Sequence, residues 1–260
     1  MSIEQDLDSS RKRIVDEAKY HDQRISNFLA GDEGNERASQ AKYYWATEMH
    51  DIALWRLIES LSRRRDVLEI GCFKGIRTVQ IGSVAKSIIG LDISAEAAKL
   101  TGRRLVEEGI NFGATLVANA ERLPFPDSSF DVVFGTSIIH HLDIGRFVRE
   151  LHRVLKPGGY AVFREPLGHN PLINLYRWRT PGARTEDEHP LLRKDLATLN
   201  DLFDIEESHY FGLSSLLATP FRGVFGGALM RDLLGWVDSL LLKASWLKHY
   251  AWQVNLVLRK

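Results

Sequence analysis

The stretch VLEIGCFKG, residues 67–75, is the strongest local signal in the sequence. A β-rich run reaches Glu69, glycines follow at Gly71 and Gly75, and a helical pattern begins directly afterwards. Glycine lets the backbone turn sharply and approach a ligand closely, and the first turn of a helix offers unpaired N–H groups. Asp92 ends the next apolar run, where a carboxylate can accept hydrogen bonds from both hydroxyls of a ribose. The two stretches together predict a nucleoside site.

Each of these features also has a simpler interpretation. The glycines can mark only a tight corner between a strand and a helix. Asp92 can cap the helix that follows it, although Ser94 is better placed for that role. The order of strand, turn, helix, strand and acidic residue favours the nucleoside site.

Periodicity predicts strands that alternate with helices from Asp66 onward. Strands are expected at Asp66–Ile70, Ser87–Leu91, Ala114–Ala118, Phe130–Phe134, Tyr160–Arg164, Phe203–Tyr210 and His249–Leu258. Amphipathic helices are expected at Gly75–Lys86, Ser94–Glu108 and Ile144–Leu155. Strands separated by helix-length segments indicate βαβ units, and therefore an α/β fold with a mainly parallel sheet.

Composition excludes several classes of protein. With 260 residues, 44% of them hydrophobic and 26% charged, the chain has a globular composition whose core can keep water from a buried site. The formal net charge of zero gives no indication of a basic surface for nucleic acid. Cys72 is the only cysteine, which excludes an intramolecular disulfide and a multi-cysteine metal site.

The N-terminal residues 1–19 are charged and contain no apolar signal segment. The run Phe211–Phe221 is too short for a membrane span, which needs roughly 18 apolar residues, and it contains Pro220. We therefore expect a cytoplasmic protein without a transmembrane span, for which peripheral contact with a membrane stays open.

Several stretches resemble the class I S-adenosylmethionine-dependent methyltransferases. The first two motifs of that family are matched by Glu69, Gly71, Gly75 and Asp92. ANAERLPFPDSSFDVVFG (118–135) resembles the family's third and fourth strands, and LHRVLKPGGYAVF (151–163) resembles its Pro-Gly-Gly turn and fifth strand. The resemblance covers about residues 66–165. It implies a Rossmann-like, seven-stranded, mostly parallel sheet with helices on both faces, to which N-terminal helices and a C-terminal helical insert are added.

The resemblance implies how the cofactor, S-adenosylmethionine, is held. Gly71 and the backbone of Cys72 would lie against its methionine part, while Glu69 braces the turn that ends at Gly75. Thr136, just past the fourth strand, would face the same methionine end.

The nucleoside part has its own set of implied contacts. Asp92 would hold the ribose, and Ile93 would pack on the face of the adenine. Asn119 and Ala120 would lie at the adenine edge, with Asn119 where the family commonly has aspartate. The amide keeps a hydrogen-bond acceptor toward the exocyclic amine of the base.

Phe73 departs from the family, which often has glycine at this position. We expect its ring to point away from the cofactor or to shape the pocket. A dinucleotide site is disfavoured, because Phe73 and Ile76 occupy glycine positions of the G-x-G-x-x-G pattern that a diphosphate needs.

The reacting methyl group of the family lies above the carboxyl ends of strands four and five. His140 and His141 follow the fourth strand and are candidates for a general base, with at most one expected to be catalytic. A capping or packing role is equally open for them. Glu165 could orient an acceptor, or could form a salt bridge to Arg164 or Arg177.

Further substrate contacts are predicted at Tyr44, His169, Asn170, Arg177 and His189. Four of the five fall in the long connection 166–190, which we interpret as a functional loop. Within it, residues 184–191 look like a helix start, with Glu186 and Asp187 suited to a first turn. No fixed spacing of ligands supports a metal site, so none is predicted.

The chain divides into four predicted parts: an N-terminal helical cap (1–62), a Rossmann-like cofactor-binding core (63–211), an apolar helical insert (212–248) and the final strand of the core (249–260). The insert places Leu229, Leu233 and Trp236 on one helical face. Packing on the body, as a lid or otherwise, is favoured for that face, ahead of a homodimer and of a membrane interface.

The predicted function is methyl transfer from S-adenosylmethionine to an O, N or C atom of a small, partly apolar acceptor, which leaves S-adenosylhomocysteine. A secondary metabolite, a lipid-like compound or a carrier-linked sugar would suit. Two alternatives stay open: a cofactor-binding regulatory or scaffold protein without methyl transfer, and a methylation-coupled cyclase. His140, His141 and Glu165 argue against the first, because such a protein needs no polar groups near the methyl.

Overall fold

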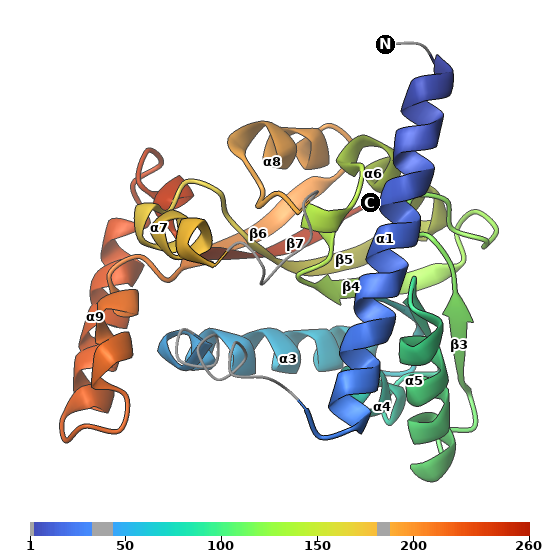
Figure 1. Ribbon diagram of the computed structural model, residues 1–260, viewed down its shortest axis with the longest axis horizontal. Helices are drawn as coiled ribbons and strands as arrows, with labels where there is room; N and C mark the ends of the chain where they lie inside the picture. Colours follow the sequence, from blue (N-terminus) through green and yellow to red (C-terminus); the bar gives the residue numbers. More distant parts are fainter. Residues whose placement is uncertain (1–2, 33–43, 181–187) are drawn as a thin grey trace.

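The computed structural model describes residues 3–32, 44–180 and 188–260 as a sheet with helices on both faces (Figure 1). The first half contains α1 (Ile3–Leu29), α3 (Glu48–Ser62), β1 (Asp66–Ile70), α4 (Ile76–Gly82), β2 (Ser87–Asp92), α5 (Ala95–Glu107), β3 (Gly113–Val117) and β4 (Phe130–Thr136). The second half contains η1 (Ile139–His141), α6 (Ile144–Val154), β5 (Leu155–Pro166), α7 (Pro171–Arg179), α8 (Arg193–Asn200), β6 (Asp204–Phe211), η3 (Ser215–Phe221), α9 (Gly227–Leu241), η4 (Lys248–Tyr250) and β7 (Gln253–Arg259).

The seven strands form one sheet in the order β3-β2-β1-β4-β5-β7-β6. β7 runs antiparallel to β5 and β6, and the remaining pairs are parallel. The predicted Rossmann-like, mostly parallel fold is therefore confirmed. Parallel strands align their carboxyl ends, so the loops after β1, β2 and β4 meet at one edge of the sheet.

Two hydrophobic layers hold helices against the sheet. On one face, Trp55 and Ile58 of α3 pack with Val132 and Phe134 of β4. On the other face, α6 and α8 pack on the sheet through a larger cluster centred on Phe147. The sheet is therefore buried on both sides, which explains why its strands read as near-continuous apolar runs.

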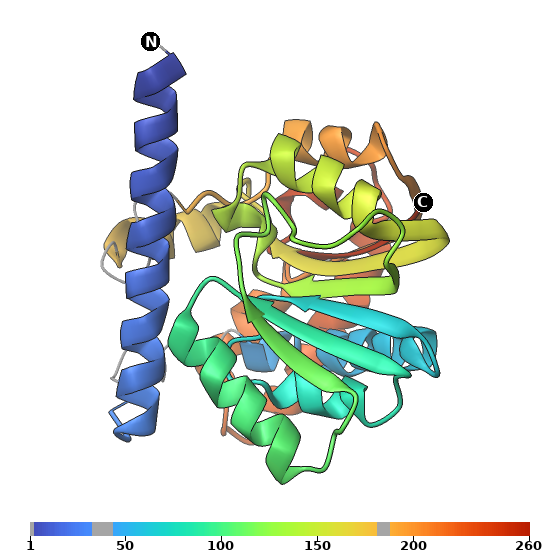
Figure 2. The same cartoon turned by 90° about the vertical axis from the view of Figure 1, so that its right-hand side faces the viewer.

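Helix α1 belongs to neither layer. It is a single helix of 27 residues that lies across the carboxyl ends of the central strands (Figures 1 and 2). Ile25 anchors it in a small cluster with Ala97 and Leu100 of α5. The helix lies in the part of the chain, residues 1–62, that the sequence analysis assigned to an N-terminal helical cap.

Local signals explain several helix ends. Ser94 caps α5, since its Oγ accepts a hydrogen bond from the backbone N of Ala97 at 3.0 Å, as the sequence predicted. The connection 166–190, interpreted as a loop, contains helix α7, because Asn170 caps it and Pro171 occupies its first position. The predicted helix start at residues 184–191 is not seen at 188–190, and Glu186 and Asp187 lie outside the described residues.

Helix α9 turns its apolar face away from the body. Leu229 is 75% exposed and Trp236 is 60% exposed, whereas Asp238 is buried. The predicted packing of this face on the body is therefore wrong. The reason is that Asp238 accepts hydrogen bonds from the backbone N–H groups of Leu213, Ser214 and Ser215, and from both serine hydroxyls, which fixes the polar side of the helix inward.

We expect Asp238→Ala to lower the free energy of unfolding by about 3 kcal/mol, because it leaves several buried donors without an acceptor. Asp232→Ala on the same helix is the matched control and should cost less than about 1 kcal/mol, since the Asp232 side chain is 57% exposed. Urea unfolding followed by circular dichroism measures both. Equal losses would show that Asp238 does not hold the helix in place.

Candidate functional site

A cavity of about 230 Å³ opens at the carboxyl ends of β1, β2 and β4 and is covered by α1. Six of the residues predicted to bind the cofactor line it: Gly71, Asp92, Ile93, Asn119, Ala120 and Thr136. Apolar side chains of Ile70, Leu91 and Ile138 complete its floor. The structure thus brings together the residues that the sequence placed at both ends of a nucleoside.

Asp92 ties two loops together at this edge. Its Oδ2 accepts from the backbone N of Phe73 at 2.9 Å, and its Oδ1 accepts from the backbone N of Ser94 at 2.9 Å. Burial raises the pKa of Asp92, and the N–H groups of Ser94 and Phe73 oppose that shift. Each carboxylate oxygen has a second lone pair, so Asp92 can still accept hydrogen bonds from ribose hydroxyls.

Glu69, Cys72 and Gly75 do not line the cavity. Glu69 accepts a 2.5 Å hydrogen bond from the hydroxyl of Thr78, and burial raises the pKa of Glu69 to about 8. The backbone N of Cys72 donates to the carbonyl of Leu91 at 3.1 Å, and Cys72 does not border the cavity. These residues shape the turn instead of bordering the space inside it.

Gly75 is required by close packing. It adopts a φ of 73°, and a Cβ there would lie 2.8 Å from the Cα of Thr101 on α5. The left-handed backbone and the short approach both exclude a larger residue. Gly75 therefore contributes to the site by allowing the backbone turn that leads from β1 into α4.

Phe73 lies at the cavity wall in a left-handed conformation, with a φ of 44°. Its backbone N–H donates to Asp92. Its ring packs, as does Phe28 of α1, against the cluster around Ile25, and the guanidinium of Arg24 lies 4.8 Å from the centre of the Phe73 ring. The expectation that the ring shapes the pocket agrees with this placement. The ring of Phe73 is therefore part of the contact between α1 and the domain.

Asn119 uses its side-chain oxygen within the loop. Oδ1 accepts from the backbone N of Glu121 at 2.9 Å, which closes a local turn. Its amide still borders the cavity beside Ala120. The predicted acceptor for an exocyclic amine is therefore shared with the backbone.

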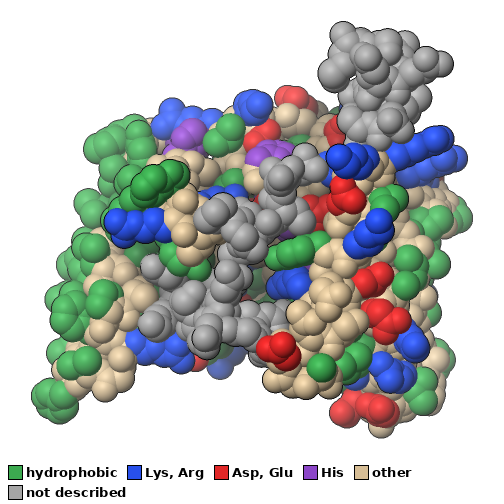
Figure 3. All heavy atoms as spheres, viewed as in Figure 1, with side chains coloured by type: hydrophobic (Ala, Val, Ile, Leu, Met, Phe, Trp, Pro, Cys, Tyr) green, Lys and Arg blue, Asp and Glu red, His purple; other side chains and the backbone are tan. Residues whose placement is uncertain are grey.

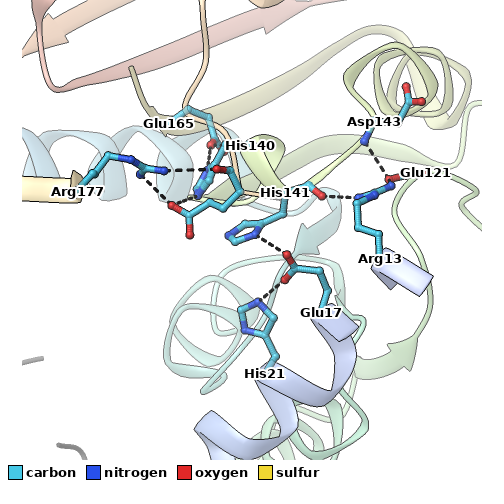
Figure 4. Close-up of polar contacts among 10 residues, drawn as sticks. Arg13, Glu17, His21, Glu121, His140, His141, Asp143, Glu165 and Arg177 are labelled. Atoms are coloured by element: carbon cyan, nitrogen blue, oxygen red, sulfur yellow. Dashed lines mark hydrogen bonds and ion pairs between the residues drawn. The ribbon is translucent and has the colours of Figure 1, made fainter. Parts of the chain in front are cut away.

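Helix α1 contributes charged residues to the cavity that the sequence analysis did not identify: Arg13, Glu17, His21 and Arg24. They recur every three or four residues and therefore lie on one face of the helix, which is the only signal that could have identified them. Arg13 donates to the carbonyl of His141 at 2.6 Å and pairs with Glu121 (Figure 4).

The two histidines of η1 have different surroundings. His141 lines the cavity, and its Nδ1 lies 3.2 Å from Oε1 of Glu17, whose other oxygen lies 3.4 Å from Nε2 of His21 (Figure 4). His140 does not line the cavity, and its Nδ1 lies 2.7 Å from Oε2 of Glu165. The histidine rings are 4.3 Å apart, so both belong to one cluster.

Glu165 is fully buried, and both of its carboxylate oxygens contact hydrogen-bond donors of the loop after β4. Its Oε1 accepts from the backbone N of Ile138 and of Ile139, each at 2.9 Å. Neither predicted salt bridge forms, because Arg164 pairs with Asp51 and Arg177 pairs with Glu188. Glu165 therefore braces the loop after β4 and orients His140, and an acceptor cannot reach its oxygens.

Arg177 lies beside the histidine pair, whereas the ring of Tyr44 packs against Trp252, with 5.3 Å between the ring centres. Arg177 Nη1 donates to Oε1 of Glu188 at 2.9 Å, and that oxygen lies 4.0 Å from Nε2 of His140. The ring of Tyr44 is 45% exposed, yet desolvation of its hydroxyl end raises its pKa, an effect opposed by Arg164. Both residues remain candidates for contact with an acceptor.

Asn170, His169 and His189 have other surroundings. The side-chain oxygen of Asn170 caps α7, and its side-chain nitrogen donates to the carbonyls of Gly212 and Tyr250. Asn170 therefore has a structural role in place of the predicted substrate contact. The ring of His169 packs edge-on against Tyr250. The backbone N of His189 donates to the carbonyl of His140, which places it beside the cluster.

Two groups of donor atoms come within 4.8 Å of one another, namely Glu17 with His21 and His141, and His140 with His141 and Glu188. The two groups share His141. Each member already contacts a protein partner. The contacts within and around the two groups are hydrogen bonds and ion pairs between protein side chains.

Comparison with known proteins defines the family. A family model described as a methyltransferase domain matches residues 68–163. A probable S-adenosylmethionine-dependent methyltransferase of Mycolicibacterium smegmatis is 37% identical over 124 residues, which cover 47% of this chain and 46% of that protein. Residues 68–163 therefore match a methyltransferase domain, and the chain is similar over this region to proteins named as S-adenosylmethionine-dependent methyltransferases. The predicted family and cofactor are confirmed.

Two further relatives extend this comparison. The phthiotriol/phenolphthiotriol dimycocerosates methyltransferase 1 of Mycobacterium ulcerans is 38% identical over 112 residues, 40% of this chain and 38% of that protein. The geranyl diphosphate C-methyltransferase of Streptomyces coelicolor shares the fold of the methyltransferase domain, with a TM-score of 0.58, 17% identity and coverage of 80% and 79% of the two chains. The chain spans less than half the length of the curated relatives that it matches.

Among the described residues, the structure contains no helix whose length and apolar character would allow it to cross a bilayer.

We expect Phe73→Gly to loosen α1 while leaving the methyltransferase domain folded. The change relieves a left-handed non-glycine residue but removes the ring on which α1 rests. Amide hydrogen exchange should become about tenfold faster along α1, which corresponds to about 1.4 kcal/mol of lost docking energy, and stay unchanged in the sheet. Ile76→Ala, an exposed position nearby, is the control. Unchanged exchange along α1 would contradict the view that the Phe73 ring helps to hold α1 in place.

Proposed function

We propose that the protein transfers a methyl group from S-adenosylmethionine to a small, partly apolar acceptor, and that His141 removes a proton from it. One observation supports this most directly. The cavity that contains Gly71 and Asp92, which match the family's cofactor motifs, is bordered by His141, a histidine paired with a carboxylate.

The lining of the cavity fits the cofactor. Asp92 offers oxygens to a ribose, and Ile93 with Ala118 and Ala120 gives an apolar wall of the kind that an adenine ring needs. The methionine part has a carboxylate and an ammonium group, and α1 borders the cavity with both Arg24 and Glu17. The cofactor would supply an electrophilic methyl group on a sulfonium, and the side chains would position the acceptor and remove its proton.

Positioning and proton removal are the tasks of the histidine cluster. Glu17 beside Nδ1 of His141 favours the tautomer that carries its proton on Nδ1, which leaves Nε2 as the acceptor of a proton. Glu165 holds His140 in the same way, and His140 packs against the ring of His141. His140 and Glu165 are thus positioning residues in this proposal.

A partly apolar acceptor is supported by the relatives and by the protein's own surface. The Mycobacterium ulcerans relative is named for a dimycocerosate substrate, and the Streptomyces coelicolor structure is named for geranyl diphosphate. In this chain α7, which carries Arg177 of the cluster, exposes Leu172, Leu175 and Trp178 to solvent. A lipid-like acceptor suits this arrangement better than a charged metabolite.

Asp92→Ala should weaken binding of S-adenosylmethionine at least about 30-fold, because it removes the acceptor for the ribose and frees the Phe73 loop. Isothermal titration calorimetry measures this affinity directly. Asp204→Ala, at the exposed start of β6, is the matched control and should bind like wild type. Unchanged affinity in Asp92→Ala would refute the proposed cofactor position.

His141→Gln should lower methyl transfer about 100-fold while donor affinity changes little, since a general base contributes 10²- to 10⁴-fold. Transfer of label from S-adenosyl-[methyl-³H]methionine to an apolar extract of the source cells is the assay. His152→Gln, on α6 and away from the cavity, is the control. Full transfer by His141→Gln would show that His141 is not the general base and that catalysis rests on positioning of the two substrates.

A further inference from the structure

Exposed apolar side chains lie on α7, η3 and α9 and on the turns beside them, and we call this surface the α7–α9 face. Its most exposed side chains are Leu172, Leu175, Trp178, Phe221, Val224, Phe225, Leu229, Leu233, Trp236, Leu240 and Trp246. Figure 3 shows hydrophobic side chains gathered along this side of the molecule, over α7 and α9. Single exposed apolar residues are ordinary, but a contiguous set marks a contact with another molecule or a membrane.

Contacts between α9 and the segment that contains η3 keep the apolar side of α9 facing outward. Asp238 fixes α9 to the start of η3 through five hydrogen bonds, and a Cβ at Gly227 would lie 2.1 Å from the carbonyl oxygen of Phe221. The intervening turn presents Phe225 fully to solvent. Because the polar side of α9 is bound to the body, the helix cannot rotate to bury its apolar side without breaking these bonds.

We infer that the α7–α9 face docks on the surface of an anionic lipid bilayer. An interfacial helix places Trp, Phe and Leu side chains at the boundary of headgroups and acyl chains, with basic residues beside them. Here Trp178, Trp236 and Trp246 lie on the face, and their indole N–H groups bond to no described protein atom. Lipid headgroups and interfacial water accept from such groups, whereas a dry protein interface would leave them unsatisfied.

Charge favours a bilayer over a second copy of the chain. Helix α7 and residues 211–250 contain six Lys and Arg side chains against Asp232 and Asp238, in a protein whose formal net charge is zero. Counting Glu48 and Glu188, which pair with two of those arginines, leaves a positive excess of two. A homodimer through this face would bring like charges together, while anionic lipid attracts them.

The position of the face connects docking with the reaction site. α7 presents Trp178 outward and Arg177 inward, where Arg177 pairs with Glu188 beside His140. A bilayer on this face would therefore lie against the helix that borders the histidine cluster. The docking surface itself does not depend on the methyl transfer proposed above, because it can be measured without turnover.

Co-sedimentation with lipid vesicles tests the inference on the full chain. Wild type should bind vesicles of equal parts phosphatidylglycerol and phosphatidylcholine about tenfold more tightly than phosphatidylcholine alone, and added salt should weaken that binding. Phe225→Asp and Trp236→Asp should each lose at least about tenfold in affinity. Phe112→Asp, a highly exposed phenylalanine between α5 and β3, is the matched control and should bind like wild type.

Calorimetric binding of S-adenosylmethionine confirms that each variant is folded, and failure of the methyl-transfer proposal would leave the vesicle result unaffected. Failure of wild type to bind either vesicle, or unchanged binding by Trp236→Asp, would overturn the inference. Sedimentation velocity without lipid supplies the other decisive outcome. A wild-type dimer that Trp236→Asp converts to a monomer would assign the face to a second copy of the chain.

Discussion

The carboxylate of Asp92 is the interaction on which the site depends. It stands at the end of β2 and bonds to the backbone of Phe73 in the preceding turn and of Ser94 at the start of α5. The same carboxylate borders the cavity. Its burial raises its pKa, and the two backbone donors oppose this by favouring the charged form. Loop geometry and the charge offered to a ligand are therefore set by the same hydrogen bonds.

The position of α1 follows from this arrangement. Phe73, held in its left-handed conformation by Asp92, presents the ring on which α1 packs. Ser94 donates its hydroxyl to Asp22 of α1 at 2.6 Å, and the backbone N of Glu96 donates to the same carboxylate at 3.1 Å. The helix that closes the cavity is thus attached to the two loops that Asp92 joins. Removal of one carboxylate would disturb the floor and the cover together.

The sequence predicted what depends on local pattern. Runs of β-branched residues indicated the strands. Ser94 indicated the start of a helix, and the glycines at residues 71 and 75 indicated a tight turn, without any knowledge of distant contacts. Signals were also present for α7, whose Asn170-Pro171 start is typical of a helix, but the length of the connection favoured a loop.

What the sequence could not predict depends on contacts between distant segments. Arg13 bonds to residues more than 100 positions away, and nothing in a charged helix identifies such partners. The periodicity of α9 gave its apolar face but not its direction, because Asp238 fixes that direction through donors about 25 residues earlier in the chain. Glu165 was likewise assigned to an acceptor or a salt bridge, since its backbone partners at Ile138 and Ile139 become visible only when β4 and β5 are paired.

The histidine pair shows how these two kinds of information combine at the reaction site. His140 and His141 are adjacent in a short 3₁₀ turn, yet each is paired with a carboxylate from a different part of the chain. Glu165 comes from β5 and is positioned by strand pairing, whereas Glu17 comes from α1, which side-chain contacts join to the rest of the domain. The orientation of His141 therefore requires α1 to be docked. Because α1 also lines the cavity, the helix that covers the site also sets the orientation of the base proposed here.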